Sequence, residues 1–564
     1  MNRNTESHFA NTPTVNIGRS KFDRSFDHKT TFNCGDLIPI YCSDVLPGDS
    51  VKMRMSEIVR MMTPIAPVMD NAYLDTYFFF VPNRLIWDHF KRFMGENDTA
   101  PWTQQTEYEV PQIVAPATTG WQDGSLADYF GYKTGVPGYK ASALPFRAYA
   151  KIWNDWFMDE NLKNPCYIST GDADINGTDK TALGANYDYT VDTEKGAAPC
   201  KAAKFHDYFT SCLPGAQKGP NVTIPLGKTA AVQATKTPTS PSTYPTNWAD
   251  PTEKLGIAIE SGSAKFYGDG NAATNGKSFS LIADLSESVG ATINQLRQAF
   301  AIQKYYEKDA LYGTRYIESV RAHFGVTNPD FRVQRSEYLG GKRIPINMNS
   351  LYASQQTTEQ AIPTYTDPAN PSPATLTWKT QNGAPQGTPG AYSVTTDTDS
   401  DLFTHSFTEH GWIIGLAVVR CDHSYMQGLN RMFIRKSKWD FYTPEFANLG
   451  NQAVLNKEIY LYGDSADDEP WGYQEAWADY RYQPSICTGL MRVNATDTLA
   501  YWHYGDWYQS RPSLSSDWID EPKENMARTL AIQDQDQLFG DFYFGAIWTR
   551  PMPLYSIPGL IDHH

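Results

Sequence analysis

The stretch Asn71-Ala-Tyr-Leu-Asp-Thr-Tyr-Phe-Phe-Phe-Val-Pro-Asn-Arg-Leu-Ile-Trp-Asp-His-Phe90 decides the fold class of this chain. Its first half is rich in Tyr and Phe, which favour β-strands and bury large side chains. Pro82 cannot extend the pairing of a strand, and Asn83 can cap a helix over Arg84–Phe93. The stretch therefore predicts a core strand that ends in a turn and a short helix.

The composition favours an all-β protein with long loops. The chain has 564 residues, with 15 Trp, 34 Tyr and 27 Phe beside 40 Gly and 36 Pro. Many aromatic residues separated by many turn residues are typical of sandwiches and barrels. Further β patterns lie far apart in the sequence, at 51–55, 412–419, 458–462 and 541–548. Such distant strands indicate long-range antiparallel pairing, and we predict an eight-stranded jelly roll of the viral capsid type with a few helices.

Two helices are predicted, each with an apolar stripe. The first begins at Pro145, a residue that suits the first helical turn, and the second begins with the capping-box pattern Thr292-Ile-Asn-Gln295. We expect both stripes to pack into the core. Their members are Phe146, Tyr149, Trp153 and Trp156 in the first helix and Ile293, Leu296 and Phe300 in the second.

Composition divides the chain into four parts. Residues 1–30 are polar and mildly basic, which predicts an extended N-terminal arm. Residues 31–220 and 291–564 carry the β patterns and helices of the core, with a long loop at about 352–404. Residues 221–290 are rich in Thr, Ser, Pro and Gly and nearly lack apolar periodicity, so they predict a surface insertion.

Charge and cysteine content limit the classes of function. A net charge of −15 makes the chain a poor general binder of nucleic acid, because phosphate contacts need Lys and Arg. Seven Cys without a CxxC pair indicate neither a disulfide framework nor a zinc site, and we expect reduced thiols. The first residues lack the apolar segment of a signal peptide, and the longest apolar run, Trp412–Val419, is too short to span a bilayer.

One segment is basic against this acidic background. Residues 420–438 contain five basic residues and a single acidic one, Asp422, with Tyr425, Phe433 and Trp439 interleaved. The basic residues are Arg420, Arg431, Arg435, Lys436 and Lys438, of which the last four are the candidates. Basic groups beside stackable rings suit single-stranded nucleic acid. The alternative is that these basic residues pair with acidic residues of a neighbouring subunit. The N-terminal arm, with Arg19, Lys21 and Arg24, is the second candidate for a nucleic-acid contact.

Patterns for catalysis and metal binding are weak. Neither HExxH nor GxSxG occurs, and the pair in Cys421-Asp-His423 lacks a recognisable oxyanion site. The run Asp464-Ser-Ala-Asp-Asp-Glu469 offers carboxylates to Ca²⁺, but it lacks the spacing of an EF-hand. We therefore expect no enzyme and no cofactor, and favour a solvated acidic loop over the alternative of Ca²⁺ at subunit contacts.

Several sequence blocks, which keep their order along most of the chain, resemble the major capsid protein of the gokushoviruses, small single-stranded DNA phages of the Microviridae. The blocks are the opening stretch, 25–32, 44–49, 62–70, 206–214, 335–341, 451–460 and 471–482. The resemblance implies a jelly-roll subunit of a T=1 icosahedral shell that encloses a circular single-stranded DNA genome. It also implies assembly in the host bacterial cytoplasm, a small basic DNA-binding protein, an internal scaffolding protein and a minor pilot protein as partners, and location in the virion.

In that family a long insertion between jelly-roll strands builds a protrusion at the three-fold axes, and residues 221–290 fall at the matching place. We expect this protrusion to contact a host cell-surface receptor, with Tyr244 and Trp248 as exposed rings. The alternative is that three protrusions only brace the three-fold axis. The rival function for the whole chain is a secreted or cell-surface β-sandwich that binds glycans, against which the missing signal peptide and the unpaired Cys argue; a glycosidase ranks third.

Overall fold

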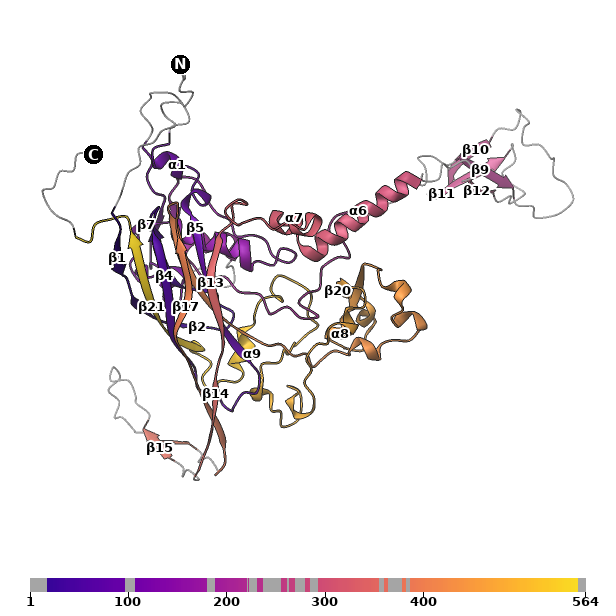
Figure 1. Cartoon of the computed structure of the whole chain (residues 1–564). Helices are drawn as coiled ribbons and strands as arrows, with labels where there is room; N and C mark the ends of the chain where they lie inside the picture. The colour runs from indigo at the N-terminus through magenta and orange to yellow at the C-terminus, as the bar shows by residue number, and fades with distance from the viewer. Residues whose placement is uncertain are drawn as a thin grey trace, which may run out of the picture. The chain divides into compact units, whose positions relative to one another are not determined.

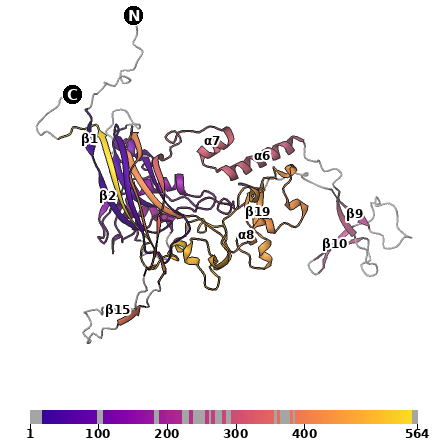
Figure 2. The same cartoon turned by 60° about the horizontal axis from the view of Figure 1, so that its bottom comes forward.

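The computed structural model describes residues 18–96, 107–179, 188–220, 222, 293–354 and 386–555, together with six short strands between these ranges. The chain forms two compact units, one comprising residues 1–216 and 310–564 and the other residues 217–309. Two packed antiparallel sheets dominate the larger unit (Figures 1 and 2). Antiparallel sheets with few helices confirm the predicted all-β class.

The first sheet of the larger unit has six strands. β21 lies inside it, pairing with β4 on one side and with β1 and β2 on the other, and the order continues through β17 to β14. All of these pairings are antiparallel. The strands are β1 (Ser20–Asp23), β2 (Phe26–Phe32), β4 (Ser50–Met61), β14 (Met348–Tyr352), β17 (Pro389–Ser406) and β21 (Leu538–Arg550).

The second sheet has four strands in the order β13-β5-β18-β3, again antiparallel throughout. The strands are β3 (Ile38–Val45), β5 (Ala72–Pro82), β13 (Glu337–Pro345) and β18 (Gly411–Cys421). β5 is the strand of the opening stretch, and Pro82 ends it as predicted. β5 and β18 lie inside this sheet, so both are buried on two faces and their sequences are nearly continuously apolar.

The main hydrophobic core lies between the two sheets. Alternate residues of β4 and β21 are buried, because successive side chains of a strand point to opposite faces. Phe78 of the four-stranded sheet is fully buried there, and its ring centroid lies 5.7 Å from that of Phe403 and 6.2 Å from that of Phe544 in the six-stranded sheet. Aromatic contacts of this kind fasten the two sheets to each other.

Helices and loops cover the other face of the four-stranded sheet. α3 (Leu144–Ile152) begins next to Pro145 as predicted and continues into a short π-helical turn, Trp153–Phe157. Phe146, Tyr149 and Trp153 of its stripe are buried in a second core. The remaining elements of this layer are α1 (Phe90–Phe93), β6 (Gln112–Val114), α2 (Leu126–Tyr129), β7 (Lys140–Ser142), β8 (Ile175–Asn176) and α5 (Tyr189–Asp192).

A third, smaller core packs residues 208–212 against the region after β18. β19 (Asn451–Leu455) pairs with β20 (Pro470–Glu475), and α9 (Lys523–Ala527) follows later in the chain. The strand predicted at 458–462 is wrong, because α8 (Asn456–Ile459) occupies its start. The Glu458 carboxylate accepts the backbone N–H of Leu455 at 2.9 Å, which closes the first turn of this helix.

In the smaller unit the described residues include two strand pairs and most of a helix. β9 (Ala231–Lys236) pairs with β12 (Phe279–Asp284), and β10 (Leu255–Glu260) pairs with β11 (Ser263–Gly268). α6 (Ile293–Tyr312) runs across the division between the units and α7 (Tyr316–Phe324) follows it. The core packing predicted for the α6 stripe is wrong, since Ile293 is 68% and Phe300 64% exposed. Periodicity identifies an apolar face but not the surface that covers it.

Two predicted boundaries need correction. Part of the predicted arm belongs to the sheet, because β1 and the first five residues of β2 fall within residues 18–30, while residues 1–17 lie outside the described part. The loop predicted at 352–404 overlaps β17, and β15 (Gln360–Pro363) pairs with β16 (Trp378–Gln381) within it. β17 is rich in Ser, Thr and Asp, and it was missed because its pairing with β4 and β14, not apolar alternation, holds it in the sheet.

No helix among the described residues is both long enough and apolar enough to cross a lipid bilayer.

Candidate nucleic-acid interface

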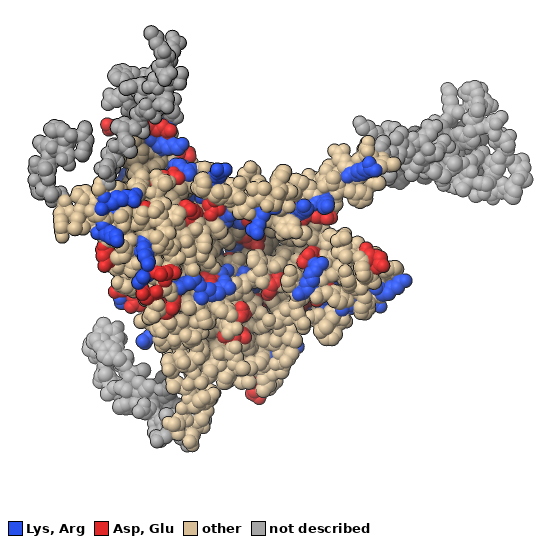
Figure 3. All heavy atoms as spheres, viewed as in Figure 1, with Lys and Arg blue, Asp and Glu red and all other residues tan. Residues whose placement is uncertain are grey.

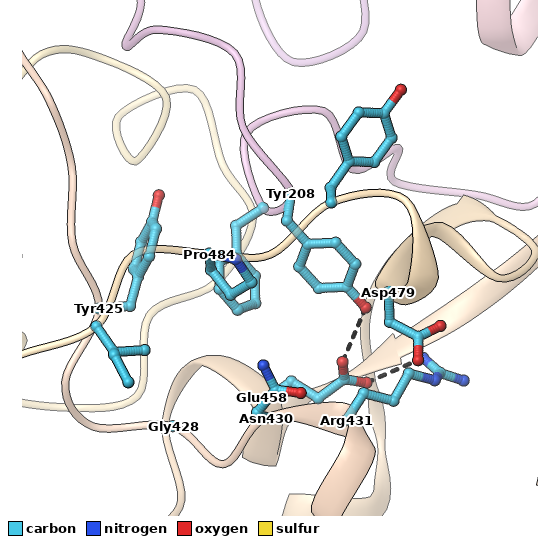
Figure 4. A pocket seen from close by; sticks show the side chains of 11 residues that line it. Tyr208, Tyr425, Gly428, Asn430, Arg431, Glu458, Asp479 and Pro484 are labelled. Carbon is cyan, nitrogen blue, oxygen red and sulfur yellow. Dashed lines mark hydrogen bonds and ion pairs between the residues drawn. The ribbon is translucent and has the colours of Figure 1, made fainter.

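Arg431, the first of the predicted basic residues, belongs to a buried ion pair. Its guanidinium donates to Glu458 Oε1 at 3.0 Å and to the Ala453 carbonyl at 2.8 Å, while Glu458 Oε2 accepts from the Tyr208 hydroxyl at 2.9 Å (Figure 4). Burial raises the pKa of Glu458, and the charge of Arg431 opposes that shift. Arg431 therefore stabilises the subunit and is not free for a phosphate.

The same residues line a narrow pocket. Tyr208, Tyr425, Asn430 and Asp479 surround it together with Arg431, as Figure 4 shows. Its volume is about 30 Å³, which is room for about two water molecules. A nucleobase or a sugar cannot enter without displacing the surrounding side chains.

Arg435 is also engaged within the subunit. It forms an ion pair with Asp479, and its guanidinium lies 4.2 Å from the ring centroid of Tyr480 and 5.6 Å from that of Phe441. The side chain is 13% exposed. The acidic partners of Arg431 and Arg435 are thus residues of the same chain, whereas the sequence left a neighbouring subunit as the alternative.

Lys436 and Lys438 differ from the two arginines because both side chains are exposed. Lys438 Nζ lies 4.4 Å from the ring centroid of Trp439. That ring is 61% exposed, and nearby Phe433 is 68% exposed. Two ammonium groups and two accessible rings are therefore what remains of the predicted basic, aromatic patch.

Of the second predicted group, Arg19 lies just before β1, Lys21 lies on β1 and Arg24 lies between β1 and β2. Arg19 donates to the Gly48 carbonyl, and Arg24 donates to Ser43 Oγ at 3.2 Å while its guanidinium lies 4.9 Å from the Trp548 ring centroid. Lys21 is exposed on β1. Over the face of the molecule in Figure 3, basic and acidic side chains are interspersed, with no broad basic field.

Three carboxylates of the acidic loop 464–469 have basic partners within the chain. Asp464 and Asp467 both bind Arg511, at 2.7 and 2.6 Å, and Asp468 pairs with Lys457. Asp467 also accepts backbone N–H groups of this loop. These carboxylates stabilise the turn.

His423 is buried, and both ring nitrogens have carboxylate partners. Nδ1 lies 3.1 Å from Asp506 Oδ1 and Nε2 lies 2.9 Å from Glu521 Oε2. Burial lowers the pKa of His423, but the two carboxylates outweigh it and raise the pKa to about 10. Both nitrogens of this enclosed imidazole are thus occupied by carboxylates and not by Cys421.

Sequence reasoning missed the partners that decide these roles. Asp479 lies 44 residues from Arg435, and Glu458 lies 27 residues from Arg431. No local pattern links such pairs, although the single acidic residue within 420–438 was a sign that the arginines needed distant partners. The predicted ring residues Tyr244 and Trp248 lie outside the described residues.

The described residues form a packed antiparallel sandwich in which Arg431, Arg435 and His423 make internal contacts. In comparison with known proteins, a family model described as "Capsid protein (F protein)" matches residues 10–366 and 364–560.

Three full-length relatives are named "Capsid protein VP1". The relative from Bdellovibrio phage phiMH2K is 38% identical over 99% of this chain and 98% of its own length. That from Spiroplasma virus 4 is 40% identical over 96% of both chains, and that from Chlamydia phage 1 is 36% identical over 98% of both. The chain belongs to this family of capsid proteins, in its gokushovirus branch; it is a structural component of a phage virion and not an enzyme.

Proposed function

We propose that this chain is the repeating subunit of a T=1 icosahedral shell around a circular single-stranded DNA genome, and that its sandwich is a viral jelly roll. The strand order of the four-stranded sheet carries the jelly-roll assignment. In the order β13-β5-β18-β3, strands from early and late parts of the chain alternate. Two Greek keys folded into two packed sheets produce such interleaving.

Particle size tests the shell. Sixty copies of a 63.4 kDa chain give 60 × 63.4 kDa, or about 3.8 MDa. We expect purified particles to have this protein mass by light scattering and to display icosahedral symmetry by electron microscopy. A protein that stays a monomer or small ring when produced with its phage partners would contradict the proposed T=1 shell.

As the capsid subunit, this chain would contact the genome through the side chains of Lys436 and Lys438 together with the rings of Phe433 and Trp439. Exposed ammonium groups attract phosphates, and exposed rings stack on bases of any sequence. Because the chain as a whole is acidic, neutralising most of the phosphate charge falls to the small basic protein that the family resemblance implies.

A double substitution, Lys436→Ala with Lys438→Ala, tests this contact. We expect shells to assemble with less packaged DNA per particle, measured as the ratio of absorbance at 260 and 280 nm. The matched control is Lys91→Ala with Lys133→Ala, which removes the same charge from exposed positions elsewhere. An equal loss of DNA in both variants, or no loss in either, would show that this patch has no specific role.

The insertion at 221–290 is the proposed site of host recognition. Its support is that residues 217–309 form a unit of their own, and that loops on a rigid scaffold commonly carry binding sites. Many copies of the insertion on one particle would raise the overall affinity for the host cell, even if each copy binds weakly, where the spacing of the receptors permits several contacts at once. Exchanging 221–290 between two phages with different hosts should transfer adsorption. Particles that assemble but keep their original host range would leave the insertion as a brace at the three-fold axis.

A further inference from the structure

Two cysteines that are far apart in the sequence meet in the core of the larger unit. Cys34 lies in the turn after β2, Cys421 is the last residue of β18, and their Sγ atoms are 3.8 Å apart. Oε1 of Glu521 lies 3.8 Å from Cys34 Sγ and accepts the backbone N–H of Cys421 at 3.2 Å. All three residues are at most 2% exposed. Among the described residues, this is the only group of three Cys, His, Asp or Glu whose ligand atoms all lie within 4.8 Å.

The two distances from Cys34 Sγ, each 3.8 Å, suit ligands of one zinc ion, and the third pair of atoms lies within 4.8 Å. Two thiolates bound to one Zn²⁺ at about 2.3 Å in tetrahedral geometry lie about 3.8 Å apart, and a thiolate and a carboxylate oxygen lie slightly closer. Two sulfurs and one oxygen are also a donor set that zinc accepts, whereas Ca²⁺ and Mg²⁺ require oxygen ligands alone. An ion between the three atoms therefore needs only small movements of the side chains.

The surroundings hold the three ligands in place. A Cβ on Gly35, next to Cys34, would lie 2.4 Å from the Glu521 carbonyl oxygen, so only glycine permits this approach of the turn to Glu521. The second carboxylate oxygen of Glu521 is fixed by His423 at 2.9 Å. Metal-binding residues are typically oriented by a hydrogen bond from a neighbouring residue that does not itself touch the metal.

We propose that Cys34, Cys421 and Glu521 bind a structural Zn²⁺ ion. Each thiol releases its proton to solvent as its sulfur binds, and Glu521 binds as the carboxylate. An oxygen completes the tetrahedron, from water or from the Val419 carbonyl, which lies 3.3 Å from Cys34 Sγ. The ion ties the turn after β2, the end of β18 and the segment before α9 together. No local spacing indicates this metal site, because the two cysteines lie 387 positions apart in the sequence.

Metal analysis of intact particles, purified without chelators, tests the proposal. We expect about one zinc ion per chain by mass spectrometry of the digested protein. Protein refolded with Co²⁺ should show a thiolate-to-cobalt charge-transfer band together with the visible bands of tetrahedral cobalt. Both measurements use the unaltered chain, so they do not depend on a variant that folds. Particles that contain no zinc, and a refolded chain that takes up neither metal, would overturn the proposal.

Variants then locate the ion. Cys34→Ser and Cys421→Ser should each lose the zinc. Cys166→Ser is the matched control, because Cys166 and Cys200 are a second buried pair with Sγ atoms 3.9 Å apart, and no third ligand joins them among the described residues. Zinc lost equally from the control, or an intact mass 2 Da below that of the reduced chain due to a Cys34–Cys421 disulfide, would contradict the assignment. Shell formation is scored separately, so particles without zinc would leave the capsid function intact.

Discussion

Replacing Arg431 with methionine separates a role in the fold from a role in genome binding. Methionine keeps much of the side-chain volume but removes the charge that faces Glu458, which is 4% exposed. The Glu458 carboxylate then keeps only neutral donors, the Tyr208 hydroxyl and the Leu455 backbone N–H, both at 2.9 Å. Removing one partner of a buried ion pair costs about 3–5 kcal/mol, so we expect the free energy of unfolding to fall by about this amount.

A second substitution divides this cost between packing and charge. In the double variant Arg431→Met with Glu458→Gln, the buried group is neutral and can still accept from Tyr208. We expect the double variant to be more stable than the sum of the two single effects predicts, by about 0.5–3 kcal/mol, as for neighbours in one network.

Urea unfolding of the purified subunit, followed by tryptophan fluorescence, measures both effects. The control is Lys436→Ala with Lys438→Ala, which changes exposed side chains and should alter the free energy of unfolding by about 0.5 kcal/mol or less. If Arg431→Met unfolded at the same urea concentration as this control, the ion pair would not stabilise the subunit. Arg431 would then return as a candidate for DNA binding.

Three further substitutions test the core, a buried acid and a close backbone approach. Phe78→Ala should cost about 3–5 kcal/mol in urea unfolding, because it leaves a cavity between the two sheets; a loss below 1 kcal/mol would contradict the described packing. Burial raises the pKa of Glu57 from 4.5 to about 7, so in the native protein its proton is retained while the unfolded chain loses it, and stability falls as pH rises from 4.5 to 7. Glu57→Gln, which also removes the ion pair with Lys342 at 2.7 Å, should abolish this pH dependence; an unchanged pH profile would refute the shift. Gly341→Ala places a Cβ 2.1 Å from the Thr76 carbonyl oxygen and should reduce the yield of folded subunit, whereas Gly545→Ala, with its nearest atom at 3.6 Å, should not; equal yields would refute the close approach.

The parts of the fold that follow from local chemistry could be predicted from the sequence. Alternation at Val51, Met53 and Met55 identified β4, because one face of that strand is buried and the other is not. Pro145 and the capping box before α6 located two helices for equally local reasons. β17 gave no such signal, because the neighbouring strands supply its hydrogen bonds and its side chains are mostly polar.

The sequence predicted which residue types the candidate site contains, but not what each of them contacts. The basic residues of 431–438 are adjacent in sequence, but the structure gives them different roles through residues that lie elsewhere. Arg435 binds Asp479, whereas Lys438 meets only the exposed ring of Trp439 among the contacts described for its ammonium group. Which cations remain available to a ligand depends on tertiary contacts, and a single sequence does not contain them in local form.

The central place of β21 in its sheet has a consequence for synthesis on the ribosome. β2 pairs with β21 over the full length of β2, Phe26 with Phe544 through Phe32 with Leu538. About 500 residues must be translated between these strands, which takes about 25–100 s at ~5–20 residues per second. During that time β1, β2 and the free edge of β4 have no partner in the sheet. A chain whose translation stops before residue 538 lacks β21 and cannot complete the six-stranded sheet. Only full-length subunits can therefore bring a complete sheet to a growing particle.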